Sequence, residues 1–173
     1  VDLIVMEMMW DIDRASRAVA AAVETGLPVW IGTSCSLFAD GSLGAWNKHM
    51  EEPADRLAPD DLKQEAKSFA SLIERMMSFE PQVIGVMHST IETTGPGLNA
   101  LFERWHGPVM AYPETSSPVR RGVGHAIEPA VFAGYCRDWV ERGVQIIGGC
   151  CGTTVEHIRA MVNELPDSMG ARR

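Results

Sequence analysis

The 173-residue chain is predicted to be an α/β protein with a parallel sheet and helices outside it. Two observations carry this prediction: five short apolar runs recur along the chain, and segments with helical periodicity alternate with them. Such units are joined by right-handed crossovers and build parallel sheets. The pattern leaves two closures open, a doubly wound sheet and part of a (β/α)8 barrel. Both place functional residues at the carboxyl ends of the strands.

The five predicted strands are continuous apolar runs, the pattern of strands that are buried on both faces. They cover residues 1–7, 28–34, 82–89, 108–114 and 144–149. We expect a longer loop after the second strand, with the sequences DGSLG and EEPADRLAP. A second polar loop, TSSPVRRGVGHAIEP, is expected after the fourth strand.

The predicted helices turn an apolar stripe toward the sheet. The first helix begins at about residue 13. The next three run from residue 60 or 61 to 79, from 95 to 105 and from 128 to 142, and the fifth begins at 153. The inward-facing residues expected for the first, fourth and fifth helices are Ala15, Ala18, Val19, Ala22 and Val23, then Phe132, Tyr135, Trp139 and Val140, then Val155, Ile158, Val162 and Leu165.

The composition is that of a globular protein, and the length suffices for one domain over residues 1–173. A formal net charge of -8 without a cluster of Lys or Arg argues against nucleic acid as a partner. No apolar run is long enough to cross a bilayer. Four cysteines are too few for a disulfide scaffold, so we expect a reducing compartment, the cytoplasm. The chain opens inside a strand-like run without an initiator Met, so we expect it to be part of a longer polypeptide.

The segment VQIIGGCCGTTVEHIRAM, residues 144–161, places two adjacent thiols at the end of a strand. Thr153 and Glu156 form a potential capping box, so the thiols of Cys150 and Cys151 would face a helix N-terminus. Its partial positive charge favours thiolate, the form that binds zinc. The alternatives are two small buried hydrophobes or a vicinal disulfide. Position, glycine flanks and capping together favour a metal.

His88 is the best candidate for a third metal ligand, because it ends another predicted strand, VIGVMHS. Two thiolates and one imidazole make an ordinary zinc site with a fourth place left open. The alternative for His88 is a hydrogen-bonded buried histidine. Cys35 also ends a strand and is the weaker candidate, whereas His157 is expected to face outward.

Glu7 is the candidate for substrate binding, because it follows an uninterrupted apolar run. Its carboxylate could accept hydrogen bonds from an amino group, and the alternative is an ion pair with an arginine. The strand-end segment YPETSSP, residues 112–118, could line a pocket through its backbone groups. No GxGxxG phosphate loop and no GxSxG nucleophile elbow occurs in the chain.

Four segments resemble the homocysteine S-methyltransferase family. GVQIIGGCCGTTVEHI resembles its zinc signature, and VDLIVMEMMWDIDRASRAVAAAVETGLPVWIG is similar to the strand and Ala-rich helix that carry its Glu. PQVIGVMHS resembles the strand that normally ends Gly-x-Asn-Cys, and PVMAYPETS the segment that usually reads Tyr-Pro-Asn. The resemblance implies a (β/α)8 barrel, of which this chain would form about the last five βα units.

The resemblance also implies the chemistry. Zinc, held by three cysteines in the family, binds the thiol of homocysteine, and the thiolate takes a methyl group to give methionine. Cys150 and Cys151 match two of the zinc ligands, His88 stands at the third cysteine position, and Glu7 matches the residue that binds the substrate amino group. The implied partners are a small-molecule thiol and a methyl donor, which the sequence does not identify.

Two departures from the family pattern generate further expectations. An imidazole at position 88 makes the site less negative by one charge, so a degenerate homologue that binds thiol or metal without catalysis is the alternative function. A third reading is an α/β enzyme with a redox-active pair of cysteines. The resemblance implies that this chain covers only strands four to eight of the barrel, which would leave bare strand edges. We therefore expect activity to depend on missing N-terminal sequence or on a partner chain, including an oligomer.

Overall fold

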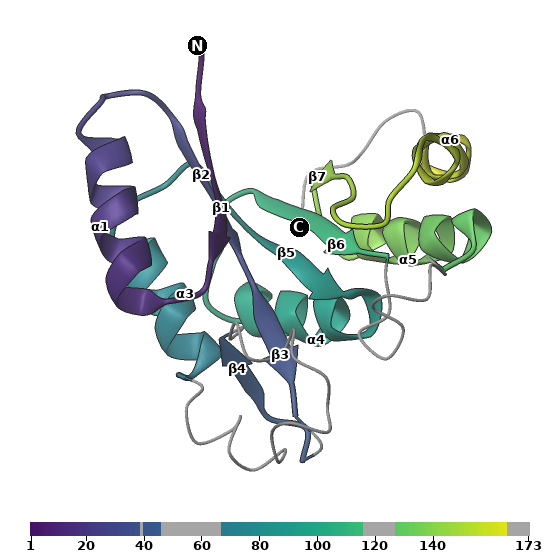
Figure 1. The fold of residues 1–173 in the computed structure, drawn as a ribbon, viewed down its shortest axis with the longest axis horizontal. Coiled ribbons are helices and arrows are strands. Elements are labelled where there is room, and N and C mark those ends of the chain that lie inside the picture. Colours follow the sequence, from purple (N-terminus) through teal and green to yellow (C-terminus); the bar gives the residue numbers. More distant parts are fainter. Residues whose placement is uncertain (39, 46–66, 116–126, 166–173) are drawn as a thin grey trace.

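The computed structural model describes residues 1–38, 40–45, 67–115 and 127–165. Five parallel strands form one sheet, and helices lie around its outer side (Figure 1). The strands are β1 (Ile4–Met9), β2 (Val29–Thr33), β5 (Val83–Thr90), β6 (Val109–Glu114) and β7 (Ile146–Ile147). The helices are α1 (Ile12–Val23), α3 (Phe69–Met77), α4 (Ile91–Phe102), α5 (Pro129–Glu141) and α6 (Val155–Glu164).

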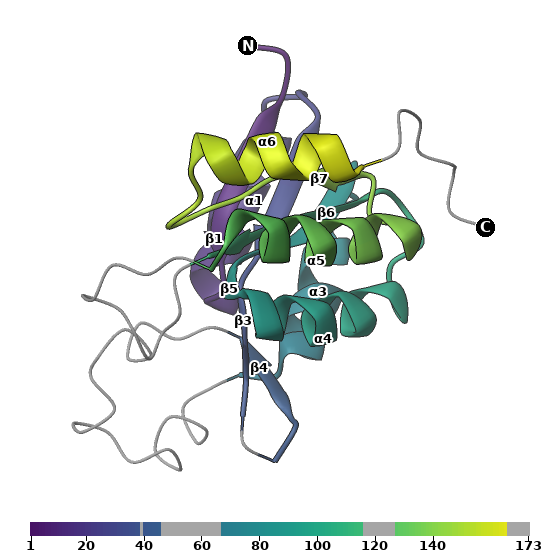
Figure 2. The same cartoon turned by 90° about the vertical axis from the view of Figure 1, so that its right-hand side faces the viewer.

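The strand order settles the choice that the sequence pattern left open. The order β1-β2-β5-β6-β7 follows the chain, and every neighbouring pair is parallel. A doubly wound sheet would reverse its order at a switch point, which does not occur here. Figure 2 shows α4, α5 and α6 stacked side by side in front of the strands, as consecutive outer helices of a barrel are. The predicted fold class, part of a (β/α)8 barrel, is confirmed.

The core lies between the sheet and these helices. On the sheet it contains alternate strand residues such as Ile31, Ile84 and Ala111, all fully buried. On the helices, large side chains are buried against the sheet, among them Phe69, Leu72, Leu98, Leu101, Phe132 and Trp139. Because side chains alternate along a strand, the intervening residues face the opposite side, which we call the inner face.

Glycines on the inner face make room for side chains of the neighbouring strand. A Cβ at Gly85 would lie 2.1 Å from Cγ of Met110, and a Cβ at Gly32 would lie 2.4 Å from the hydroxyl oxygen of Tyr112. The side chains of β6 therefore lie across β2 and β5, and the inner face is packed by neighbours within the sheet.

The first helix, α1, largely follows the sequence prediction. Asp11 caps α1 by accepting from the N–H groups of Asp13 and Arg14, and Ala15, Val19 and Ala22 are buried. Ala18 is half-buried and Val23 is 40% exposed, so the buried stripe is narrower than predicted.

Three boundaries differ from the prediction. Residues 35–45, expected as loop, contain an antiparallel hairpin of β3 (Cys35–Leu37) and β4 (Leu43–Ala45). The helix α4 begins at Ile91 and not at 95, because Thr90 caps it and Pro96 is accommodated inside the helix. The strand β7 has only two residues. The expected helix over 60–79 is found as α3, and its part before residue 67 lies outside the described residues, as does most of the predicted polar loop after β6.

The last helix is rotated relative to the prediction. Val155, Ile158 and Val162 are 66%, 37% and 62% exposed, whereas His157, expected outside, is only 3% exposed. The reason is a pair of hydrogen bonds: His157 Nδ1 accepts from the N–H of Thr154, and its Nε2 lies 2.7 Å from the carbonyl oxygen of Ile127. The N-cap is Thr154, not Thr153, and the partner in the capping box is His157, not Glu156.

The buried stripe of α5 also differs in part. Phe132 and Trp139 are buried as predicted, but Val140 is half-buried and Tyr135 is 38% exposed.

No helix in the described part of the chain is long and apolar enough to span a membrane.

Candidate metal centre

Three potential metal ligands meet at the carboxyl end of the sheet. His88 Nδ1 lies 3.5 Å from Sγ of Cys150 and 3.4 Å from Sγ of Cys151, and the two sulfurs are 3.9 Å apart. Among the described residues, His88, Cys150 and Cys151 are the group whose ligand atoms could hold one metal ion. The structure therefore brings the three predicted ligands together.

A bulge in β5 aims His88 at the two cysteines. The pairing of β5 with β6 is regular up to Met87 and resumes, shifted, at Thr90. His88 has a φ of 44°, in the left-handed region that non-glycine residues rarely adopt. Such strain costs about 1–3 kcal/mol and is concentrated at functional sites. The bulge turns the imidazole toward the cluster, which the regular strand period would not do.

The cysteine loop is fastened to the end of β6. The N–H of Cys150 donates to the carbonyl oxygen of Pro113 at 2.9 Å, and the N–H of Thr115 donates to the carbonyl oxygen of Cys151 at 2.8 Å. Gly152 has a φ of 77°, which closes the turn that follows the thiols. These bonds hold both sulfurs at the end of β6, the strand that lies between β7 and the His88-bearing strand β5 in the sheet.

The spacing of the three ligand atoms fits zinc. With Zn–S bonds of about 2.3 Å and Zn–N bonds of about 2.0 Å, a tetrahedral site separates two sulfurs by about 3.8 Å and a sulfur from a nitrogen by about 3.5 Å. The distances of 3.9, 3.5 and 3.4 Å match these values. The three side chains would thus occupy three corners of a tetrahedron around a bound zinc ion, with the fourth corner available to another ligand.

The thiol of Cys150 is not activated by its surroundings. Burial is the largest influence, and it raises the pKa of Cys150 to about 11, with smaller contributions from Cys151 and Glu114. Desolvation thus outweighs the hydrogen bond with the backbone of Cys151, which lowers the pKa. A bound cation would have to displace the proton.

Glu114 is a neighbour of the cluster that the sequence did not single out. The strand-end segment YPE was expected to contribute backbone groups, but the side chain of Glu114 is only 3% exposed. Its Oε2 lies 4.0 Å from His88 Nδ1. The signal that could have found it is its position at the end of β6, between the strands that carry the predicted ligands.

Glu7 lies within β1, two residues before its end, and is exposed. Because Ile4 and Met6 pack against the core, Glu7 faces the inner side of the sheet. Burial raises the pKa of Tyr112, and electrostatic interactions with the nearby Glu7 and Cys150 raise it further. Glu7 and the cysteine loop therefore flank the same tyrosine on the inner face.

The remaining candidates lie elsewhere. Cys35 is buried in β3, where its N–H donates to the hydroxyl oxygen of Ser89, and burial raises its pKa to about 12. It is not a member of the cluster. Both cysteines of the cluster are free thiols, as is Cys136 in α5.

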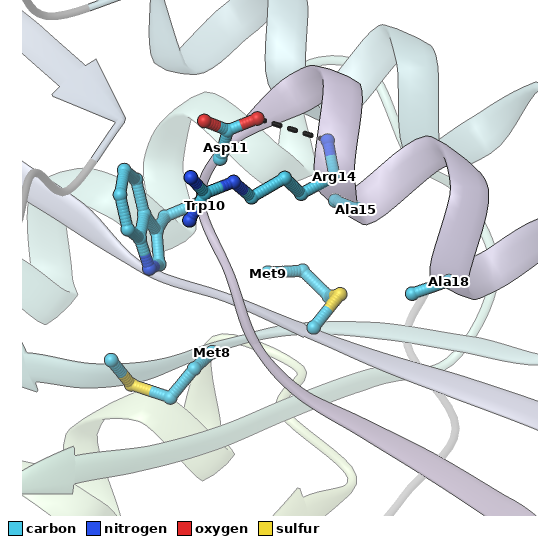
Figure 3. A pocket seen from close by; sticks show the side chains of 7 residues that line it. All are labelled: Met8, Met9, Trp10, Asp11, Arg14, Ala15 and Ala18. Carbon is cyan, nitrogen blue, oxygen red and sulfur yellow. Dashed lines mark hydrogen bonds between the residues drawn. The ribbon is translucent and has the colours of Figure 1, made fainter.

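A cavity of about 170 Å³ lies between the end of β1 and the first turns of α1 (Figure 3). Its lining is apolar apart from Asp11 and Arg14, which are joined by the bond from the Arg14 N–H to the Asp11 carboxylate. The lining residues are Met8, Met9, Trp10, Asp11, Arg14, Ala15 and Ala18. No ligand of the metal cluster is among them, so this cavity is separate from the candidate centre.

Fold and site together define an α/β protein of the (β/α)8-barrel type, with a cluster of two cysteine thiols and one imidazole at the carboxyl ends of its strands. The family model for homocysteine S-methyltransferase matches residues 1–165. The chain belongs to the homocysteine S-methyltransferase family.

Solved structures show the same fold. The oxidized form of the homocysteine methyltransferase MmuM from Escherichia coli superposes with a TM-score of 0.64 at 18% identity, over 94% of this chain and 45% of that one. The metallated form of that enzyme gives a TM-score of 0.61 at 16% identity, with the same coverage of 94% and 45%. The apo form gives 0.62 at 17% identity over 95% of this chain and 49% of that one. The chain thus spans about half the length of these relatives.

Proposed function

We propose that the protein is a zinc-dependent S-methyltransferase that moves a methyl group to the thiol of homocysteine or of a related compound. Membership of the family supports the reaction class. The observation that carries the proposal is the meeting of His88 Nδ1 with the sulfurs of Cys150 and Cys151 at distances suited to zinc. Because the chain spans about half of MmuM, the proposal concerns the whole polypeptide to which this chain belongs.

The three ligands would hold the cation and leave one position for a thiol. Zinc, when bound, supplies a Lewis acid that lowers the pKa of a thiol substrate. The chain's own contribution is position: the bulge at His88 and the bonds that fasten the cysteine loop fix where the sulfur of the substrate would lie. Holding the reacting atoms in line accounts for a large part of the acceleration in such displacements.

Glu7 is proposed to bind the amino group of the substrate. It faces the same side of the sheet as Tyr112, whose phenol is influenced by both Glu7 and Cys150. A carboxylate at this place would orient an amino acid whose thiol lies at the cluster. Removing this carboxylate should therefore raise KM for homocysteine and leave the zinc content of the protein largely unchanged.

The experiment that tests the proposal combines metal content with activity. Zinc is measured by elemental mass spectrometry in the full polypeptide and in its Cys150→Ser and His88→Ala variants. Methyl transfer to homocysteine is measured on the same samples with a panel of methyl donors. We expect about one zinc per chain, lost in both variants together with activity. A full polypeptide that binds no zinc would disprove the catalytic proposal.

A second candidate function is a degenerate homologue that binds thiol or metal without catalysis. The imidazole at position 88, where the family motif has a cysteine, favours it. Under this alternative, zinc binds but no methyl group moves, and His88→Cys produces a large gain of activity. If the natural protein is active and His88→Cys lowers its activity, the degenerate reading is wrong.

A further inference from the structure

A buried carboxylate lies beside the candidate centre without belonging to its ligand set. Glu114 is 3% exposed, and its Oε2 lies 4.0 Å from the same His88 nitrogen that faces the two sulfurs. The atoms that could hold one ion come from His88, Cys150 and Cys151, and Glu114 is not among them. Its place is next to the ligands and outside their tetrahedral face.

The charges of the centre show what such a carboxylate would do. Two thiolates and a neutral imidazole balance the two charges of a zinc ion, so the occupied site would be neutral. Glu114 adds one negative charge in a buried setting, where electrostatic interactions are stronger than in water. A cation held by the three ligands would lie close to this carboxylate and would be attracted by its charge.

We propose that Glu114 is a positioning residue of the metal centre, whose carboxylate supplies the negative charge that the imidazole of His88 does not. It acts through the electrostatic field on the cation, without coordinating the metal. The two positions also depart together from the motifs that the chain resembles: an imidazole replaces a thiolate at 88, and a carboxylate replaces an amide at 114. The two exchanges have opposite effects on the charge of the site. The inference rests on the proposed zinc site.

The first test is the zinc affinity of the full polypeptide, measured by competition with a chromophoric chelator. Glu114→Gln keeps the shape of the side chain and removes its charge. Loss of a partner outside the ligand set typically weakens metal binding by about 10–100-fold, and we expect this range. Glu114→Asp should restore most of the affinity. Glu24→Gln, which removes an exposed carboxylate at the end of α1, is the matched control and should leave affinity unchanged.

The second test separates a charge effect from a structural one. In the His88→Cys background the third thiolate already supplies the missing charge, so Glu114→Gln should cost at least about fivefold less affinity there than in the natural protein. A purely structural role would give the same cost in both backgrounds. Should Glu114→Gln fail to fold, as judged by circular dichroism, Glu114→Asn provides the same comparison.

The outcomes are distinct from those of the proposed function. If the natural protein binds zinc and the Glu114→Gln variant binds it equally well, the role of Glu114 is disproved and the zinc site stands. The same conclusion follows if Glu114→Gln lowers zinc affinity by the same factor in the natural and the His88→Cys backgrounds. If the natural protein binds no zinc, both proposals fail. The inference is supported if Glu114→Gln lowers zinc affinity much more in the natural protein than in the His88→Cys background and Glu114→Asp restores that affinity.

Discussion

Nδ1 of His88 lies 3.5 Å from Sγ of Cys150, although 62 residues separate them along the chain. The contact follows from the sheet order, because β6 pairs with both β5 and β7 and brings their carboxyl ends to one edge. The bulge at His88 then turns its imidazole toward the two sulfurs. Parallel strands thus provide the approximate meeting point, and two local backbone features provide the ligand geometry.

Zinc affinity should rise with pH. The pKa of Cys150 is raised to about 11, so its thiol is protonated in the metal-free protein at neutral pH. Binding must release that proton, which strengthens apparent affinity by about tenfold for each pH unit below the pKa. Chelator competition between about pH 6 and pH 9 measures the slope. Cys35→Ser should keep the slope, and Cys150→Ser should reduce it by about one. A pH-independent affinity would contradict the assignment of Cys150 as a ligand.

The cysteines should react with iodoacetamide in a fixed order. Cys151 is exposed and should be alkylated first, followed by half-buried Cys150. Cys35 and Cys136 are buried, and burial raises the pKa of each to about 12, so both should react only on unfolding. Zinc should protect Cys150 and Cys151 alone. Peptide mass spectrometry of timed samples provides the readout, and early labelling of Cys35 would contradict the structure.

Much of the fold, and the three residues that meet in the candidate centre, could be predicted from sequence, because apolar strand runs and strand-end polar residues are local signals. The bulge at His88 and the burial of Glu114 could not be predicted this way, since both depend on the pairing of β5 with β6. The rotation of α6 was missed for a related reason. Its hydrophobic stripe suggested Val155 and Val162 as inward residues, whereas hydrogen bonds of His157 to its own helix and to Ile127 determine which side is buried.

His157 should be important for stability, not for catalysis. Its two ring nitrogens connect the start of α6 with Ile127, two residues before α5, and its ring packs edge-on against Phe132. We expect His157→Ala to lower the free energy of unfolding by about 2–4 kcal/mol, from lost hydrogen bonds and a cavity. Urea unfolding monitored by circular dichroism measures this. The exposed His106 offers the control, and His106→Ala should change stability by less than about 0.5 kcal/mol. Equal effects of the two variants would contradict the bridging role.

Two Gly→Ala variants should change stability in opposite directions. A Cβ at Gly85 would lie 2.2 Å from the carbonyl oxygen of Met110, which is backbone and cannot move aside, so Gly85→Ala should destabilise by about 1–3 kcal/mol. Gly134 lies inside α5 with no atom within 4 Å of an added Cβ, and Gly134→Ala should stabilise by about 0.5–1 kcal/mol through helix propensity. Thermal and urea unfolding of the two variants against the parent give both signs. If Gly85→Ala were as stable as the parent, Met110 would not lie across β5, and the packing of the inner face beside the candidate centre would have to be different.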